Sequence, residues 1–407
     1  MADDQFRRRV ASGEVLFREG ERADCAYLIE EGRLEVSVER DGTPHVLAEL
    51  RAGSLIGEMA LIDSGTRTAT VRALENTLLT RVERGHLENR LENADPLLRH
   101  MLDRLIGRYR DVVRRLDAVA GPKPVPELGS GQYRALAFST IKSGLALEQA
   151  LERDQFVLHY QPIMRLSDHS IAGFEALIRW LHPERGLVNP DDFIPAAEQS
   201  GLIVEMGRWV ARTAVAALAQ LDQVTPQPAV PLFMTVNLSG WQLKDNAFAS
   251  VLEGAIRQNK LDASRVRLEI TESALFDRID DAERLLHQCT DLGVGLAVDD
   301  FGTGYSALSY LYRLPVTCVK LARPFINDLS EYPQTSKIVS AVSRLARELQ
   351  MQTVAEGVEK AQQASAVRDL GIEYGQGFFY AAALPLTVAA SFAERTVASS
   401  LQRERFA

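Results

Sequence analysis

The sequence predicts a multidomain chain in which an N-terminal β-barrel or jelly roll with a dimerising helix precedes a C-terminal β/α (TIM-like) barrel. Residues 12–83 contain short β-rich runs separated by single glycines, a pattern typical of small all-β barrels and jelly rolls. From about residue 145, apolar runs of strand length alternate with helical stretches, which indicates a β/α architecture. Between these regions, Gly121–Gly131 is rich in proline and glycine, so we expect a linker there.

Composition sets limits on the class of protein. The 407 residues are 46% hydrophobic and 25% charged, enough to bury the cores of about two domains. A formal net charge of -9 argues against a protein that coats nucleic acid, which needs a basic surface. Three scattered cysteines indicate a reducing compartment and no disulfide scaffold. The sequence has no apolar leader and no window long enough to span a bilayer, so we expect a cytoplasmic protein without membrane contact.

One segment of the N-terminal region, LIGEMALIDSGTRTATV from residue 55 to 71, differs from the surrounding strands. Gly57 can open a short helix whose free N–H groups accept an anion, and Glu58 can accept hydrogen bonds from sugar hydroxyls. Arg67 can pair with a phosphate through its planar guanidinium. The alternative is a structural barrel that no longer binds a ligand.

This segment resembles the phosphate-binding cassette of cyclic-nucleotide-binding domains, and the resemblance covers about the first 120 residues. It implies that Gly57 and Glu58 contact the ribose 2′-hydroxyl and that Arg67 contacts the cyclic phosphate. The effector would be cAMP or cGMP. Thr68 is compatible with either base, so the sequence leaves that choice open.

A heptad pattern follows the predicted barrel. Its apolar positions are spaced 4, 3, 4, 3 and 4 apart on one predicted helix: Leu98, Leu102, Leu105, Tyr109, Val112 and Leu116. The helix can pack on its own barrel, or it can pair two chains. The cyclic-nucleotide-binding family includes the bacterial catabolite activator, which dimerises through a helix in this place, so the resemblance favours pairing and we expect a homodimer. The DNA-reading element of that activator is replaced here by the linker and the second domain, so we expect no nucleic acid polymer as a partner.

In the C-terminal region, polar residues recur at the downstream ends of successive strand-like runs. They are Glu175, Asn237, Glu269 with Glu272, Asp299 with Asp300, Lys320, Glu356 and Gln376. The C-terminal strand ends of a β/α barrel converge on one mouth, where such enzymes place their chemistry. A single buried acid at the end of a strand usually caps the strand or forms a salt bridge. Seven consecutive strands that end in polar residues instead indicate an active site.

The residue types favour particular ions. Carboxylate and amide oxygens without histidine or cysteine suit Mg²⁺ or Mn²⁺. Adjacent acids such as Asp299 and Asp300 allow one carboxylate to bridge two ions, the arrangement that serves phosphoester hydrolysis. We therefore expect two Mg²⁺ or Mn²⁺ ions per active site.

The same residues resemble the EAL family of cyclic di-GMP phosphodiesterases, through the motifs YQPI, EALIRW, NLS, EITES, DDFGTGYSALSYL, VAEGVE and QGF. Members of this family hydrolyse cyclic di-GMP to linear pGpG. The resemblance implies a first metal held by Glu175, Asn237, Glu269 and Asp299, and a second served by Asp299, Asp300 and Glu356. It implies catalytic roles for Lys320, Glu356 and Gln376, substrate contacts from Gln161, Leu177 and Arg179, and coupling of the metal site to a dimer interface through Glu272.

Two departures from the family pattern stand out. Ala322 replaces an acid two residues after the lysine, and Ala382 with Ala383 replaces a basic residue and a proline. The alternative function is a weak or inactive cyclic di-GMP receptor that signals through contacts, but the retained metal ligands favour the enzyme. The expected domain limits are residues 1–120 for the nucleotide-binding domain, 121–139 for the linker, 140–395 for the phosphodiesterase domain and 396–407 for a tail.

Overall fold

The computed structural model describes residues 6–40, 43–57, 66–83, 143–224, 230–277, 279–303 and 313–404. These residues belong to two compact units, which we treat separately. Glu58, the heptad positions 98–116 and the linker 121–139 lie outside the described residues. The dimerising helix and the domain limits therefore stay predictions. Among the described residues, no helix combines the length and the apolar character that a membrane crossing needs.

The N-terminal unit contains two four-stranded antiparallel sheets, with strand orders β1-β8-β3-β6 and β2-β7-β4-β5. The strands are β1 (Arg7–Val10), β2 (Val15–Phe17), β3 (Cys25–Glu31), β4 (Arg33–Arg40), β5 (Thr43–Arg51), β6 (Leu55–Ile56), β7 (Thr70–Ala73) and β8 (Thr77–Glu83). Apolar side chains of both sheets form one core, which includes Val10, Ile29, Leu34, Val71 and Leu79. The predicted all-β jelly roll is confirmed.

The C-terminal unit is a closed barrel of eight strands, in the order β10-β12-β13-β14-β15-β16-β17-β9, with β9 pairing back to β10. The strands are β9 (Phe156–Arg165), β10 (Ile171–His182), β12 (Phe233–Asn237), β13 (Val266–Thr271), β14 (Gly295–Phe301), β15 (Cys318–Leu321), β16 (Gln352–Ala355) and β17 (Tyr374–Gln376). Two short strands pair at its margin: β11 (Gly186–Val188) with β10 and β18 (Leu384–Pro385) with β9. The predicted TIM-like barrel is confirmed.

The barrel differs from an all-parallel barrel at one strand. β9 runs antiparallel to both of its neighbours, β10 and β17, whereas the other seven strands are parallel. A short turn joins β9 to β10, and such a turn can join only antiparallel strands. The seven parallel strands are those whose downstream ends carry the predicted polar residues, so these ends meet on one side of the barrel.

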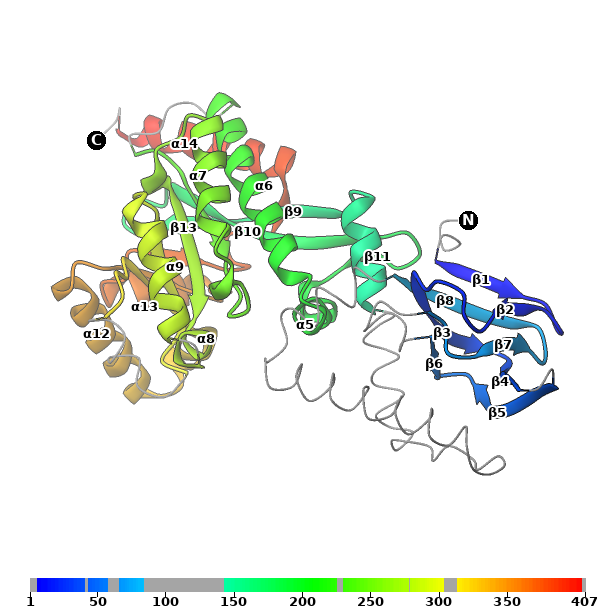
Figure 1. The fold of residues 1–407 in the computed structure, drawn as a ribbon. Helices are drawn as coiled ribbons and strands as arrows, with labels where there is room; N and C mark the ends of the chain where they lie inside the picture. The colour runs from blue at the N-terminus through cyan, green and yellow to red at the C-terminus, as the bar shows by residue number, and fades with distance from the viewer. Residues whose placement is uncertain are drawn as a thin grey trace. The chain divides into compact units, whose positions relative to one another are not determined.

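Helices cover the outside of the barrel (Figure 1). They are α6 (Ile203–Val224), α7 (Phe248–Gln258), α8 (Glu272–Asp277), α9 (Ile279–Asp291), α11 (Arg323–Asn327), α12 (Pro333–Glu348), α13 (Ala361–Asp369) and α14 (Leu386–Glu404). A further helix, α5 (Ile194–Ser200), packs against the extension of β9 and β10. Alternate strand residues face this outer layer, where Phe174 and Leu218 are fully buried. A second cluster that includes Ile163, Phe233 and Tyr374 brings together side chains from separate barrel strands. Below the polar residues, the barrel is packed with apolar side chains and forms a floor for the site.

Candidate active site

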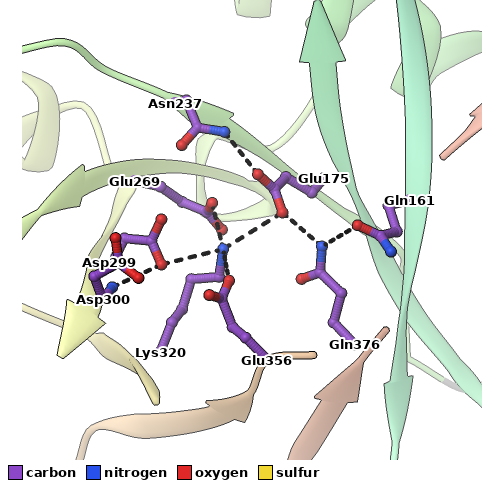
Figure 2. Close-up of polar contacts among 9 residues, drawn as sticks. All are labelled: Gln161, Glu175, Asn237, Glu269, Asp299, Asp300, Lys320, Glu356 and Gln376. Atoms are coloured by element: carbon purple, nitrogen blue, oxygen red, sulfur yellow. Dashed lines mark hydrogen bonds and ion pairs between the residues drawn. The ribbon is translucent and has the colours of Figure 1, made fainter. Parts of the chain in front are cut away.

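The barrel brings the predicted polar residues together at one end (Figure 2). Asn237 and Gln376 are the last residues of β12 and β17, and Glu356 directly follows β16. Glu175 differs, because β10 continues to His182. Only Gly173–Ala176 of β10 pair with β12, and the strand then extends beyond the barrel against β9 and β11. Glu175 therefore lies at the end of the barrel although it lies in the middle of its strand.

Lys320 lies at the centre of the cluster. Its Nζ is 2.7 Å from Glu269 Oε2, 2.6 Å from Glu356 Oε1, 3.4 Å from Glu175 Oε2 and 3.6 Å from Asp299 Oδ1. The lysine side chain is 1% exposed, so its charge depends on these carboxylates for solvation. One ammonium therefore holds together acids contributed by β10, β13, β14 and the end of β16.

Side-chain amides fix the orientation of Glu175. Asn237 Nδ2 donates to Glu175 Oε1 at 2.7 Å, and Gln376 Nε2 donates to Glu175 Oε2 at 2.6 Å. Gln376 Nε2 also lies 3.0 Å from Gln161 Oε1, and Gln161 Nε2 donates to the carbonyl of Ala381 at 3.2 Å. Gln161 is thus engaged at both ends of its amide and links the loop at Ala381 to Glu175. Sequence reasoning identified Gln161 and Gln376 separately but did not anticipate their contact.

The carboxyl groups of the cluster differ in the direction in which their pKa values are shifted. Burial raises the pKa of Glu269 well above its usual value and raises that of Glu356 to about 7. Burial also raises the pKa of Asp300, with a further contribution from Asp299. Glu175 is the exception: burial opposes its charge, but Lys320 and the two amide donors lower its pKa. At neutral pH the cluster therefore contains protonated acids, and a cation that binds to them must displace their protons.

Lys320 keeps its proton. Burial alone would lower its pKa, but the carboxylates of Glu175, Glu269 and Glu356 raise it well above the usual value. The lysine is accordingly a fixed positive charge. It can donate hydrogen bonds but cannot serve as a base near neutral pH.

Three acids gather beside the lysine. Each of Asp299, Asp300 and Glu356 has an oxygen within 4.8 Å of the others, which is close enough to share an ion. Asp300 has a φ of 53°, a left-handed conformation that costs energy for any residue other than glycine. Its N–H donates to Asp299 Oδ1 at 2.9 Å. Such strain is typical of functional sites, where the surrounding structure maintains it.

The remaining predicted residues lie around this cluster. Glu272, the first residue of α8, is buried and accepts a hydrogen bond from Gly302 N at 2.9 Å, so it ties α8 to the segment after β14. Leu177 and Arg179 follow Glu175 along β10 at intervals of two, so the three side chains share one face of the strand. The segment 304–312 lies outside the described residues.

The structure locates both departures from the family pattern. Ala322 is fully buried at the N-cap of α11 and makes no side-chain capping bond. An acid at that position could cap the helix through Phe325 N, whose hydrogen bond now goes to the Ala322 carbonyl at 3.1 Å. The exposed Ala382 and the neighbouring Ala383 lie in the loop that leads from β17 to β18.

The N-terminal unit contains a second candidate site. Arg67 is 5% exposed, and its guanidinium donates to the carbonyls of Cys25 at 2.7 Å and Gly57 at 3.1 Å. The guanidinium carbon lies 4.1 Å from the centre of the Phe17 ring, and Arg67 Nε is buried without a hydrogen-bond partner among the described residues. Thr68 is exposed. The structure thus brings Gly57 and Arg67 together, while Glu58 lies outside the described residues.

Comparisons with known proteins agree with both units. Residues 145–383 match the EAL domain family, and residues 7–94 match the cyclic nucleotide-binding domain family. Because the first match spans more than half of the chain, the chain belongs to the EAL domain family.

A curated relative is the cyclic di-GMP phosphodiesterase NbdA of Pseudomonas aeruginosa, which is 40% identical over 60% of this chain and 31% of its own length. The chain spans about a third of the length of the curated relatives it matches. The solved EAL enzyme Bd1971, in a form with cAMP and cyclic di-GMP bound, is 30% identical with a TM-score of 0.60. That match covers 95% of this chain and all of the other. A phosphodiesterase, PaMucR, in complex with cyclic di-GMP is 39% identical with a TM-score of 0.57, over 61% of this chain and 99% of that chain.

We expect Lys320→Met to destabilise the cation-free protein by about 3–5 kcal/mol, because the variant leaves buried carboxylates without their counter-charge. The loss of stability should become smaller as the pH falls from 8 to 5, because Glu356, with its pKa of about 7, then takes up a proton and no longer needs a counter-charge. Urea unfolding in chelator measures both effects. Lys337→Met, which removes an exposed lysine from α12, is the matched control. Equal stabilities of the two variants would contradict this account of the cluster.

Proposed function

We propose that this chain is a metal-dependent phosphodiesterase that hydrolyses cyclic di-GMP to linear pGpG, and that cAMP or cGMP bound by its N-terminal unit regulates the reaction. The observation that carries the proposal is the set of five carboxylates, from Glu175, Glu269, Asp299, Asp300 and Glu356, around one buried ammonium. Membership of the EAL domain family and the likeness to the PaMucR phosphodiesterase support the substrate assignment.

The donor set fits divalent cations. All of the acids offer hard oxygen ligands, and their combined negative charge exceeds the single positive charge of Lys320. Gln376 Oε1 is buried without a hydrogen-bond partner among the described residues, so it is available to accept a hydrogen bond from a group bound at the site. We assign Glu175, Asn237, Glu269 and Asp299 to a first Mg²⁺ or Mn²⁺ ion, and Asp299, Asp300 and Glu356 to a second.

Bound cations would polarise the scissile phosphate and lower the pKa of an attacking water. The chain's own residues position the other participants. Gln376 and Asn237 hold both oxygens of Glu175 in place, and Lys320 Nζ, fixed among the carboxylates, offers a positive charge to a phosphate oxygen or to the water. In the cation-free site Glu356 has a pKa of about 7 and can hold a proton, which a bound cation would displace, while its Oε1 lies 2.6 Å from Lys320 Nζ. Leu177, Arg179 and Gln161 border the cluster and would bind the rest of the substrate.

Turnover of cyclic di-GMP to pGpG should require added Mg²⁺ or Mn²⁺ and should cease in excess chelator. Glu175→Gln should reduce the rate at least a hundredfold, because it removes the charge that the amides and Lys320 orient. Glu348→Gln, an exposed change on α12, is the matched control and should leave the rate unchanged. Chromatography of the products measures the reaction.

Two results would contradict the enzyme assignment. One is full turnover in chelator or in the Glu175→Gln variant. The other is tight binding of cyclic di-GMP by the wild type without any product in the presence of either cation, which would identify a receptor.

The regulatory part of the proposal rests on the N-terminal unit. Its match to the cyclic nucleotide-binding domain family and the cAMP-bound form of Bd1971 support a mononucleotide ligand. Gly57 and Arg67 lie together, and Glu58 and Thr68 would complete the contacts to the nucleotide. A homodimer formed through the heptad helix would carry the change toward the barrel. The buried, unpaired cysteines support a cytoplasmic protein.

We expect cAMP or cGMP to bind and to raise the phosphodiesterase rate, with cAMP as the stronger effector. Coupling free energies between sites are about 1–3 kcal/mol, so the effect should be about fivefold or more. Arg67→Ala should remove it by leaving the phosphate without a charged partner. Arg72→Ala, on the neighbouring exposed surface, is the control. The measurement is turnover against each nucleotide. Absence of binding would contradict the sensor, and binding without a change in rate would contradict the coupling.

A further inference from the structure

Gln161 lies between two other residues of the site. The antiparallel strand β9 pairs with β10 on one side, where Gln161 is directly opposite Glu175, and with β17 on the other. Gln376, the last residue of β17, meets Gln161 from that second side (Figure 2). Gln161 Oε1 accepts from Gln376 Nε2 at 3.0 Å, and Gln161 Nε2 donates to the Ala381 carbonyl at 3.2 Å. Both ends of the Gln161 amide are therefore bonded within the protein.

The two amides form a hydrogen-bonded chain that can run in only one direction. A backbone carbonyl only accepts, so the end of Gln161 that faces Ala381 must be its NH₂ group. The oxygen of Gln161 then faces Gln376, which must present its own NH₂ group. That group also donates to Glu175 Oε2 at 2.6 Å. A reversed Gln376 amide would set its oxygen against oxygens of both Gln161 and Glu175, which is repulsive.

The carbonyl at the start of this chain is held in place by the turn that follows β17. Ala381 N donates to the carbonyl of Gly377 at 3.2 Å, and Phe379 N donates to that of Val358 at 2.9 Å. Val358 N in turn donates to the carbonyl of Gln376 at 2.9 Å. A Cβ on Gly377 would lie 2.2 Å from Val358 O, so only glycine allows the two segments to approach this closely. The turn thus fixes the acceptor relative to the ends of β16 and β17.

The direction of the chain determines what Gln376 offers to the site. Its Nε2 donates to Gln161 and to Glu175, so both of its N–H groups are used. Its Oε1 is buried and has no hydrogen-bond partner among the described residues. Without the bond from Gln161, the amide could turn over, and Glu175 Oε2 would lose its amide donor.

We propose that Gln161 is a positioning residue of the metal site: it passes the fixed direction of the Ala381 carbonyl to the Gln376 amide, which holds Glu175 oriented for a divalent cation. Hydrogen-bond partners that orient a metal ligand in this way typically change metal affinity or activity by about 10–100-fold. The inference rests on the proposed function, because Glu175 is assigned to a metal only there. The role is separate from a contact between Gln161 and the substrate, since it operates before any substrate binds.

The test measures metal binding without substrate. Calorimetry on the full chain gives the affinity for Mn²⁺, and kcat and KM for cyclic di-GMP are measured at saturating Mn²⁺. Gln161→Met, which keeps the length of the side chain but removes its amide, should weaken Mn²⁺ binding about tenfold, lower kcat by a similar factor and leave KM within about twofold. A substrate contact alone would instead raise KM and leave the Mn²⁺ affinity unchanged. Gln288→Met, an exposed change on α9, is the matched control and should alter neither.

A second background tests whether Gln161 acts through Gln376. In a Gln376→Met chain, Gln161→Met should change the Mn²⁺ affinity by no more than about twofold, because the link to Glu175 is already broken. Equal weakening in both backgrounds would overturn the relay. If Gln161→Met does not fold, Gln161→Asn, whose shorter amide cannot reach from Ala381 to Gln376, makes the same comparison.

The outcomes also separate this inference from the proposed function. Unchanged Mn²⁺ affinity in Gln161→Met, with a wild type that binds Mn²⁺ and hydrolyses cyclic di-GMP, would overturn the positioning role and leave the proposed function standing. If the wild type does not bind Mn²⁺, the proposed function fails first, and the role of Gln161 fails with it.

Discussion

The ion cluster around Lys320 is the constraint on which the site depends. A lysine that is 1% exposed is stable only if several negative groups replace its hydration, and here four carboxylates lie within 4 Å of its ammonium. These acids come from different strands. Their shared attraction to one charge therefore holds the acids of these strands around a single point. The barrel brings the acids together, and the lysine determines how closely they approach.

The same cluster is incomplete by itself. Five acids face one ammonium, and burial, with a further contribution from neighbouring carboxylates, raises the pKa values of Glu269, Asp300 and Glu356. Either protons or divalent cations must compensate that charge. Near neutral pH the two compete, because Glu356 has a pKa of about 7. Metal binding, proton release and stability of this site are consequently linked.

Much of the barrel and its site could be predicted from the sequence, because both follow from periodic patterns. Polar residues at the ends of apolar strands predicted one mouth, and the structure brings Glu269, Lys320 and Glu356 together there. Features that depend on long-range pairing could not be predicted. The antiparallel course of β9 is the first, since strand direction is absent from a hydrophobic pattern. The contact between Gln161 and Gln376, 215 residues apart, is the second.

The central claim is that cations replace protons in the carboxylate cluster, and proton release on metal binding tests it most directly. Calorimetric titration of Mn²⁺ in buffers of different ionisation enthalpy yields the number of protons released. At pH 6, where Glu356 is largely protonated, we expect about one proton released from this residue, falling toward zero by pH 8.5. Glu356→Gln should remove the share of the proton release that Glu356 contributes. Binding of Mn²⁺ with the same proton count at both pH values, or no binding at all, would contradict the account.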